Sequence, residues 1–99
     1  MKPFIFHPEA KTEFAEAASY YATVTPALGV RFHNEIHRLI AEAGQTPAMF
    51  RIIRKPARRH FTREFPYGII YVDRPDDFWI LAVMHLHREP GYWTHRMSR

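Results

Sequence analysis

The stretch that decides the fold is Phe78-Trp79-Ile80-Leu81-Ala82-Val83-Met84-His85-Leu86-His87, near the C-terminal end of the chain. Its first seven residues are apolar at odd and at even positions alike. A strand with this pattern is buried on both faces, so we expect it in the interior of a sheet. The run is also far shorter than the roughly 20 apolar residues that a membrane-spanning helix requires.

Shorter strands are predicted on the N-terminal side of this segment. Strand patterns occur at residues 50–54, 58–65 and 69–72, with turns at 55–57 and 66–68 and a loop at 73–77. Connections this short favour antiparallel pairing of consecutive strands, so we expect these segments to form a meander with residues 78–87.

Two amphipathic helices are predicted before the meander, and residues 3–6 predict a short strand before them. Pro8 suits the first turn of a helix that ends near Thr23, and Thr25-Pro26 begin a second helix that ends at Gly44. The link between the helices is so short that they must form an antiparallel hairpin. The hairpin covers one face of the sheet, which leaves no helix for the other face. We therefore expect a single α+β domain over residues 1–99: an N-terminal strand, an antiparallel helical hairpin and an antiparallel β-meander packed on it.

Composition excludes several classes of protein. The 99 residues are 46% hydrophobic and include no cysteine, so a disulfide, a thiolate metal site and a cysteine nucleophile are excluded. The start of the chain lacks the apolar run of a secretory signal. We expect a cytoplasmic protein that has no membrane association and no cofactor or metal.

The net charge of +4 is unevenly distributed along the chain. Residues 1–50 carry four basic and five acidic side chains, whereas residues 51–99 carry ten and five. The densest cluster, called the basic run below, is Arg51, Arg54, Lys55, Arg58, Arg59 and Arg63. On neighbouring strands these side chains would form one positive surface for nucleic-acid phosphate or a carboxylate-rich peptide. The alternative is a charged sheet edge that resists aggregation.

A second cluster follows the long strand and consists of His85, His87, Arg88, Tyr92 and Trp93. Imidazoles transfer protons near neutral pH, arginine holds phosphate, and aromatic rings stack on bases. Metal-independent RNA cleavage needs these functions. Alternatively, the imidazoles hydrogen-bond the backbone and complete the core.

Residues two apart on a strand share a face. We therefore expect His85 and His87 to lie in line with Trp79, Leu81 and Val83.

Two other groups of polar residues lie on the predicted helices. His33 and His37 have the spacing of a zinc-binding pair, but no third ligand follows, so we interpret them as residues flanking the apolar stripe. Glu9, Glu13 and Glu16 share one side of the first helix, which we interpret as its solvated face.

The order and spacing of these features resemble the RelE/ParE superfamily of type II toxin–antitoxin toxins. The resemblance covers nearly the whole chain. It rests on His7-Pro8, Ala10, Phe14-Ala15, Ala18-Ser19-Tyr20-Tyr21, Leu28-Gly29, Arg31-Phe32, Glu35, Pro47, Arg58-Arg59, Phe65-Pro66-Tyr67, Ile70-Tyr71, Ala82-Val83-Met84-His85, Arg88, Pro90 and Trp93.

The resemblance implies a toxin that is neutralised by its own cognate antitoxin. In this superfamily the C-terminal segment of the antitoxin wraps the toxin, often with a helix on the hairpin and a strand along the sheet. Such segments are commonly acidic, which would suit the basic run. Operator DNA is then a partner only through the antitoxin.

The resemblance leaves the target open between two branches. ParE-like members inhibit DNA gyrase without nuclease chemistry, and His85, Arg88 and Trp93 favour this branch, although Leu86 and His87 replace a common Gly and Arg. The candidates for contact with the target are His85, His87, Arg88 and Trp93. RelE-like members are enzymes that cut messenger RNA in the ribosome, and the candidates for catalysis are Arg59, Arg63, His85, Arg88 and Tyr92. A third hypothesis is an interaction module that keeps the toxin fold without toxicity.

Overall fold

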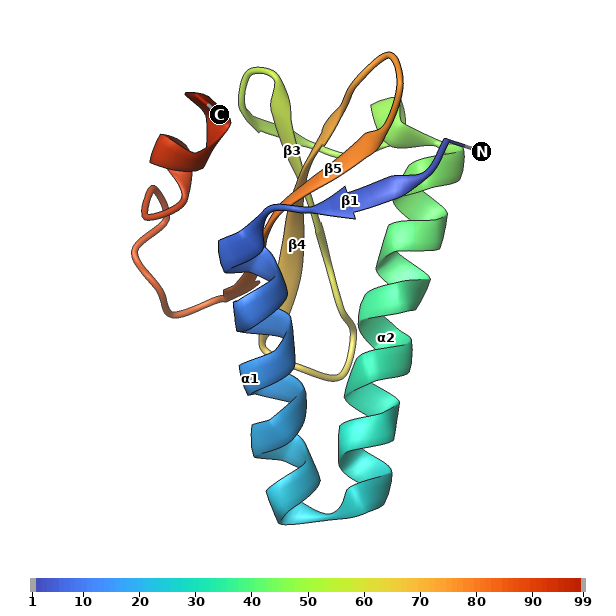
Figure 1. Cartoon of the computed structure of the whole chain (residues 1–99), viewed down its shortest axis with the longest axis vertical. Coiled ribbons are helices and arrows are strands. Elements are labelled where there is room, and N and C mark those ends of the chain that lie inside the picture. The colour runs from blue at the N-terminus through green and yellow to red at the C-terminus, as the bar shows by residue number, and fades with distance from the viewer. Residues whose placement is uncertain (1, 99) are drawn as a thin grey trace.

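The computed structural model describes residues 2–98, which form two helices and one five-stranded sheet (Figure 1). In chain order the elements are β1 (Phe4–Phe6), α1 (Pro8–Val24), α2 (Pro26–Gln45), the 3-10 helix η1 (Pro47–Met49), β2 (Ile52–Arg54), β3 (Ala57–Phe61), β4 (Tyr67–Asp73), β5 (Phe78–His85) and the 3-10 helix η2 (Thr94–Ser98). The predicted α+β class and the order of elements are confirmed. β3 ends earlier than expected, and β4 begins earlier.

The strands are ordered β1-β5-β4-β3-β2 across the sheet. Strands β2 to β5 form the antiparallel meander that the short connections predict. β1 pairs in parallel with β5 on the other side, where Phe4 lies opposite Phe78 and Phe6 opposite Ile80. β5 therefore lies between two strands, in the interior position that its apolar sequence predicts.

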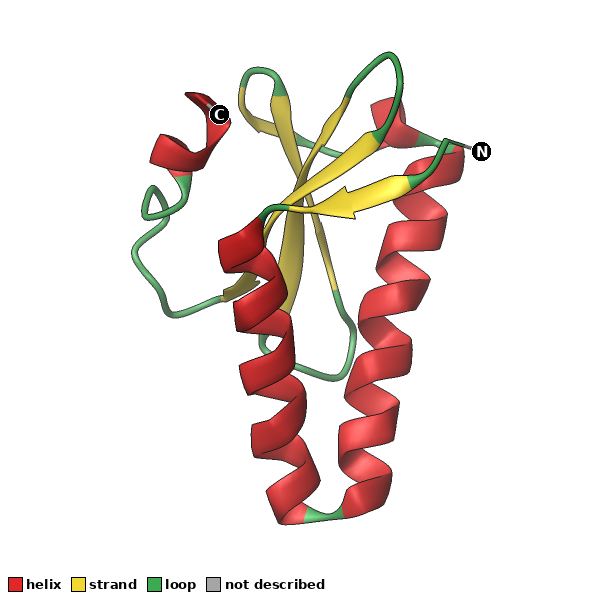
Figure 2. Ribbon diagram, in the orientation of Figure 1, coloured by secondary structure: helices red, strands yellow, loops and turns green. Residues whose placement is uncertain are grey.

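The helical hairpin begins and turns at capped positions. The Nδ1 atom of His7 accepts a hydrogen bond from the backbone N–H of Glu9 at 3.1 Å, and Pro8 follows as the first residue of α1. Thr25 caps α2 in the same way, because its Oγ1 accepts from the N–H of Leu28 at 3.1 Å. The two helices run antiparallel, and the end where they join projects beyond the sheet (Figure 2).

The main core lies between the hairpin and one face of the sheet. Phe32, Ile36 and Leu39 of α2 are fully buried there. From the sheet, Tyr71 and Ile80 pack in the same cluster. The apolar stripe predicted for the second helix therefore faces the sheet, and this burial is the main favourable term in folding.

The other face of the sheet is also covered, by residues 86–98 (called the C-terminal segment below). Trp93 in this segment is only 2% exposed and packs with Leu81, Met84 and Ala57 of the sheet, with Tyr92 beside it. As expected, neither α1 nor α2 covers this face, and the C-terminal segment takes their place. The segment has no helical or strand periodicity, yet its aromatic side chains bury enough apolar surface to dock it.

A β-bulge in β5 changes which side chains share a face. Ile70 lies opposite Ala82 and Tyr71 opposite Ile80, so Leu81 has no partner on β4. Leu81 and Ala82 consequently both lie in the cluster under the C-terminal segment, whereas Val83 returns to the hairpin side. The expectation that His85 lies in line with Trp79 and Leu81 is therefore wrong, because strict alternation stops at the bulge.

Gly29 allows the two helices to approach closely. A Cβ atom at this position would lie 2.7 Å from the Cβ of Ala22 and 2.9 Å from its Cα. We expect Gly29→Ala to destabilise the protein by about 1–3 kcal/mol, because the backbone of α1 must move away. In an unhindered helix, replacing Gly by Ala raises the free energy of unfolding by roughly 1 kcal/mol. The expected net loss therefore means that the clash outweighs this gain.

Urea denaturation of the Gly29→Ala variant measures this effect. Asn34→Ala is the matched control, since Asn34 is exposed on the same helix and its replacement should leave stability unchanged or slightly raised. A Gly29→Ala variant as stable as the Asn34→Ala variant would contradict the close contact.

Candidate functional site

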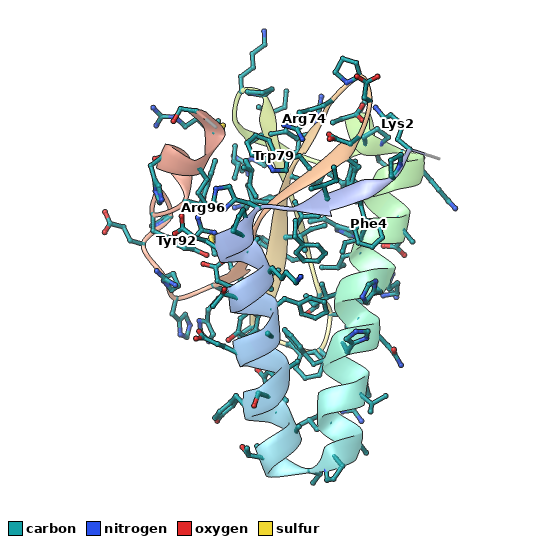
Figure 3. All side chains as sticks on the ribbon, viewed as in Figure 1. Lys2, Phe4, Arg74, Trp79, Tyr92 and Arg96 are labelled. Atoms are coloured by element: carbon teal, nitrogen blue, oxygen red, sulfur yellow. The ribbon has the colours of Figure 1, made fainter. Side chains whose placement is uncertain are left out.

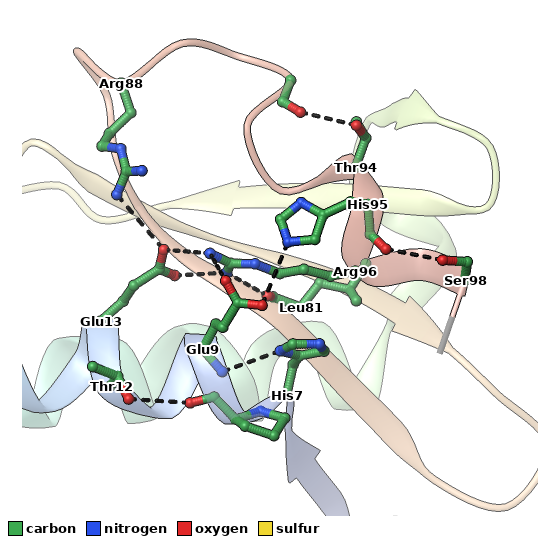
Figure 4. A network of polar contacts seen from close by, with 12 residues as sticks. His7, Glu9, Thr12, Glu13, Leu81, Arg88, Thr94, His95, Arg96 and Ser98 are labelled. Atoms are coloured by element: carbon green, nitrogen blue, oxygen red, sulfur yellow. Dashed lines mark hydrogen bonds and ion pairs between the residues drawn. The ribbon is translucent and has the colours of Figure 1, made fainter.

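The carboxylate of Glu13 on α1 joins the hairpin to β5 and the C-terminal segment (Figure 4). It accepts hydrogen bonds from Nη1 and Nη2 of Arg96 at 3.0 and 2.8 Å, and from the backbone N–H of Val83 at 3.1 Å. Arg96 also donates to the carbonyl oxygen of Leu81 at 2.9 Å, which is the bulged residue of β5. β1 pairs with β5 only as far as Ile80. Beyond that residue, the ion pair supplies hydrogen-bond partners for the backbone of Leu81 and Val83.

Two of the three acidic residues of α1, Glu9 and Glu13, are paired with cations. Glu9 lies 3.4 Å from the imidazole of His95 and 3.5 Å from the guanidinium of Arg96. Burial disfavours the charge of Arg96, but hydrogen bonds to Glu13 outweigh this and raise its pKa. The interpretation of this helix side as a solvated face is therefore wrong for Glu13, whereas Glu9 and Glu16 are exposed.

His85 lies at the end of β5, in a cleft of about 190 Å³ between the sheet and α1. The cleft is lined by Glu13, Glu16, Ala17, Tyr20, Tyr67, Val83, His85 and Arg88. The His85 ring lies 5.0 Å from that of Tyr67, and its Nδ1 accepts from the backbone N–H of His87 at 3.0 Å. The two imidazoles lie together, 5.1 Å apart, although only His85 lines the cleft.

The ring of Tyr92 contacts two arginines of this network, Arg88 and Arg96, of which Arg96 is labelled with it in Figure 3. The guanidinium of Arg88 stacks 3.8 Å above the ring, and that of Arg96 lies 5.1 Å from its centre. The hydroxyl oxygen is buried near the carboxylate of Glu13, but makes no hydrogen bond of normal distance and angle among the described residues. Burial, reinforced by the charge of Glu13, raises the pKa of Tyr92, so the group stays protonated and shielded from solvent.

The basic run does not form a single surface. Arg58 donates to the carbonyl oxygens of Ala48 and Phe50 at 3.3 and 2.8 Å, and so holds the segment before β2. Arg59 points to the opposite face, where its guanidinium lies 4.7 Å from the ring of Phe61 and lines a cleft beside the C-terminal segment.

The remaining members, Arg51, Arg54, Lys55 and Arg63, are exposed. Within residues 2–98, no cation of the basic run lies within 4.0 Å of a carboxylate oxygen. Arg51, Arg54 and Lys55 thus form an uncompensated positive region at the β2–β3 end of the sheet, whereas Arg63 lies apart in the β3–β4 loop.

The residues that RNA cleavage would require are dispersed. Arg59 lies on the face covered by the C-terminal segment, whereas His85 opens toward α1. Arg63 lies in the β3–β4 loop, where its backbone N–H approaches Glu35 at 3.5 Å. Arg88 is the one that joins candidates together: its guanidinium stacks on Tyr92, and its backbone N–H donates to the carbonyl oxygen of His85 at 3.1 Å. His85 and Arg88 also line the same cleft.

An apolar groove lies along the projecting end of the hairpin and has a volume of about 450 Å³. It is lined by Ala18, Ser19, Ala22, Pro26, Gly29, Val30 and His33. Val30 is 62% exposed there. The groove was not among the predicted sites, although Ala18 and Ala22, four residues apart on α1, and Gly29 on α2 could have indicated it.

Comparison with known proteins assigns the family. The profile described as "ParE toxin of type II toxin-antitoxin system, parDE" matches residues 4–90. The chain belongs to this ParE toxin family.

A solved structure described as "Chromosomal ParDE TA system from P. aeruginosa" has a TM-score of 0.72 and 11% sequence identity, and the match covers 86% of this chain and 96% of that one. At this identity the likeness shows the shared fold alone. No curated protein sequence is similar enough to count as a match.

Metal binding and membrane spanning were both considered for this ParE-family chain. Residues 2–98 contain no group of three or more side chains that could hold a metal ion. Neither helix in the described part of the chain has the length and hydropathy needed to cross a bilayer.

The ion pair between Glu13 and Arg96 could not be predicted from the sequence, because 83 residues separate the two partners. We expect Glu13→Gln to lower the free energy of unfolding by about 2–3 kcal/mol, because the buried guanidinium of Arg96 loses its counter-charge. Urea denaturation at neutral pH measures the change. The matched control is Glu16→Gln, which removes the same charge from an exposed residue on the same helix and should shift stability by less than about 0.5 kcal/mol. Equal effects of the two variants would show that the ion pair contributes nothing specific.

Proposed function

We propose that this ParE-family chain is a toxin that inhibits DNA gyrase by binding to it, and that a cognate antitoxin neutralises it. The separation of Arg59 and Arg63 from the group formed by His85, Arg88 and Tyr92 supports the choice of mechanism. General acid–base catalysis needs groups within hydrogen-bond reach of one substrate. Binding to a protein target has no such requirement.

The target-binding surface in this proposal is the end of β5 and the start of the C-terminal segment. His87 and Arg88 are exposed there, and His85 lines the cleft beside them. Trp93, which the sequence also suggested for this role, is buried, so its contribution would be to hold the segment on the sheet.

The antitoxin-binding surface in this proposal has two parts. A helix of the antitoxin would bury apolar side chains in the groove of the hairpin, whose open lining includes Val30 and Ala22. An acidic C-terminal segment of the antitoxin would meet the uncompensated basic run. Operator DNA would be bound only through the antitoxin.

Supercoiling by purified DNA gyrase tests the proposed activity. We expect the isolated toxin to block supercoiling of relaxed plasmid and to cause cleaved DNA complexes to accumulate, while translation in a cell-free extract continues. Tyr92→Phe should keep this inhibition, because the buried hydroxyl makes no hydrogen bond of normal distance and angle among the described residues.

Unchanged supercoiling at concentrations that arrest growth would overturn the gyrase assignment. Cuts inside codons of translated messages, lost in the Tyr92→Phe and Arg88→Ala variants, would instead establish ribosome-dependent RNA cleavage. Harmless expression without an antitoxin would indicate an interaction module.

A variant of the groove tests the antitoxin surface. Val30→Asp places a charge in the apolar groove, so we expect growth arrest to persist when the cognate antitoxin is co-expressed. Affinity for the antitoxin should fall at least about tenfold in a pull-down titration, equivalent to roughly 1.4 kcal/mol. Asn34→Asp is the matched control, since it adds the same charge to an exposed residue of α2 outside the groove. Full rescue of Val30→Asp by the antitoxin would exclude the groove as its binding site.

A further inference from the structure

Two histidines of α2, His33 and His37, lie next to each other, about one helical turn apart. Their ring centres are 4.5 Å apart, and the ring planes are tilted by 38°. His33 is exposed and also lines the groove of the hairpin, whereas His37 is half-buried. The proposed function uses the groove but gives neither imidazole a role.

Aromatic residues of two other elements hold both imidazoles in position. The ring of Phe14 on α1 stacks on that of His33 at 5.2 Å, and lies 5.6 Å from that of His37. The ring of Phe4 on β1 meets that of His37 edge to face at 5.9 Å. These contacts restrict the separation of the two imidazoles before any ligand binds, which reduces the entropy that binding would cost.

The ring nitrogens of this pair are available to a ligand. Neither side chain makes a hydrogen bond or an ion pair within residues 2–98. The nitrogens of His37 are not among the buried polar atoms that lack a partner in this part of the chain, so they keep contact with solvent. Burial and the neighbouring His33 lower the pKa of His37, which favours the neutral imidazole that metal ions bind.

The separation of the two rings fits a shared metal ion. Because zinc binds an imidazole nitrogen at about 2.0–2.1 Å, two rings bound to one ion at roughly 90–110° have centres about 4.5–5.2 Å apart. The 4.5 Å between His33 and His37 lies within this range. A spacing of four residues also places two histidines on one helix face, as in helical zinc motifs.

A second pair of histidines in the chain is less suited to a metal ion. The ring centres of His85 and His87 are 5.1 Å apart. However, the Nδ1 atom of His85 accepts a hydrogen bond from the backbone N–H of His87 at 3.0 Å, so one of its two ring nitrogens is already used. The pair on α2 has no such competing contact among the described residues.

We propose that His33 and His37 bind one divalent transition-metal ion, such as Zn²⁺ or Cu²⁺, at the edge of the hairpin groove. Residues 2–98 contain no group of three candidate ligands, so a tetrahedral zinc ion on this pair keeps two positions open. Water, or a donor side chain of a protein docked in the groove, completes the coordination. Only that second source of ligands rests on the proposed function.

Titration of the intact, tag-free protein with Zn²⁺, followed by nuclear magnetic resonance, tests the proposal. The chain has seven histidines, so spectra of His33→Gln and His37→Gln variants assign the two imidazole signals. We expect both signals to shift in a saturable way with one ion per chain, and EDTA to reverse the shift. Mg²⁺ should leave them unchanged, because it prefers oxygen ligands.

Variants distinguish a chelating pair from single imidazoles. His33→Gln and His37→Gln should each raise the dissociation constant for Zn²⁺ at least about tenfold, because each leaves one point of attachment instead of two. His95→Gln is the matched control, since it removes an exposed histidine far along the chain, and its effect should stay below about twofold. His87→Gln tests the second pair and should have an equally small effect. A dispersed spectrum confirms folding, and His33→Gln decides the question if His37→Gln does not fold.

Three results would overturn the proposal. The absence of saturable shifts at the two imidazoles would exclude a metal site on α2. Equal effects of His33→Gln and His95→Gln would indicate ions spread over single histidines. Loss of binding in His87→Gln alone would assign the metal to the end of β5. Each result can occur whether or not the protein inhibits gyrase, so the supercoiling assay tests the proposed function independently.

Discussion

The burial of β5 on both faces is the constraint on which the rest of the structure depends. A strand of seven consecutive apolar residues cannot face water on either side without a large loss of hydrophobic free energy. The helical hairpin covers one face, and the C-terminal segment covers the other through Trp93. The two layers come from opposite ends of the chain, so the strand between them holds the two ends of the sequence in one unit.

The edge of β5 poses a second problem that apolar packing cannot solve. β1 pairs with β5 only as far as Ile80, and the bulge at Leu81 further disrupts the ladder. Glu13 and Arg96 supply hydrogen bonds to this edge and form an ion pair with each other. A single network therefore completes the sheet, fixes α1 against it and anchors the C-terminal segment.

The elements with a regular period could be predicted from the sequence, whereas the site could be predicted only in part. Helical spacing and short connections define the hairpin and the meander, because local propensity and burial agree there. The bulge at Leu81 and the docking of Trp93 depend on contacts between distant residues, and an aperiodic segment shows no burial pattern. His85 and Arg88 were identified by residue type, but Glu13, their neighbour in the cleft, was interpreted as a solvated residue for the same reason.

The positive region over β2 and β3 follows from how the acidic residues are used elsewhere. Glu13 pairs with Arg96, and Glu42 lies within 2.9 Å of Arg38 and 2.7 Å of His60, so these carboxylates are unavailable to the basic run. Individual exposed pairs contribute little to stability, but their placement leaves the net charge concentrated at one end of the sheet. Attraction to an acidic partner at this end weakens with salt, whereas burial in the apolar groove of the hairpin does not. The two surfaces therefore offer such a partner two physically distinct means of binding the same chain.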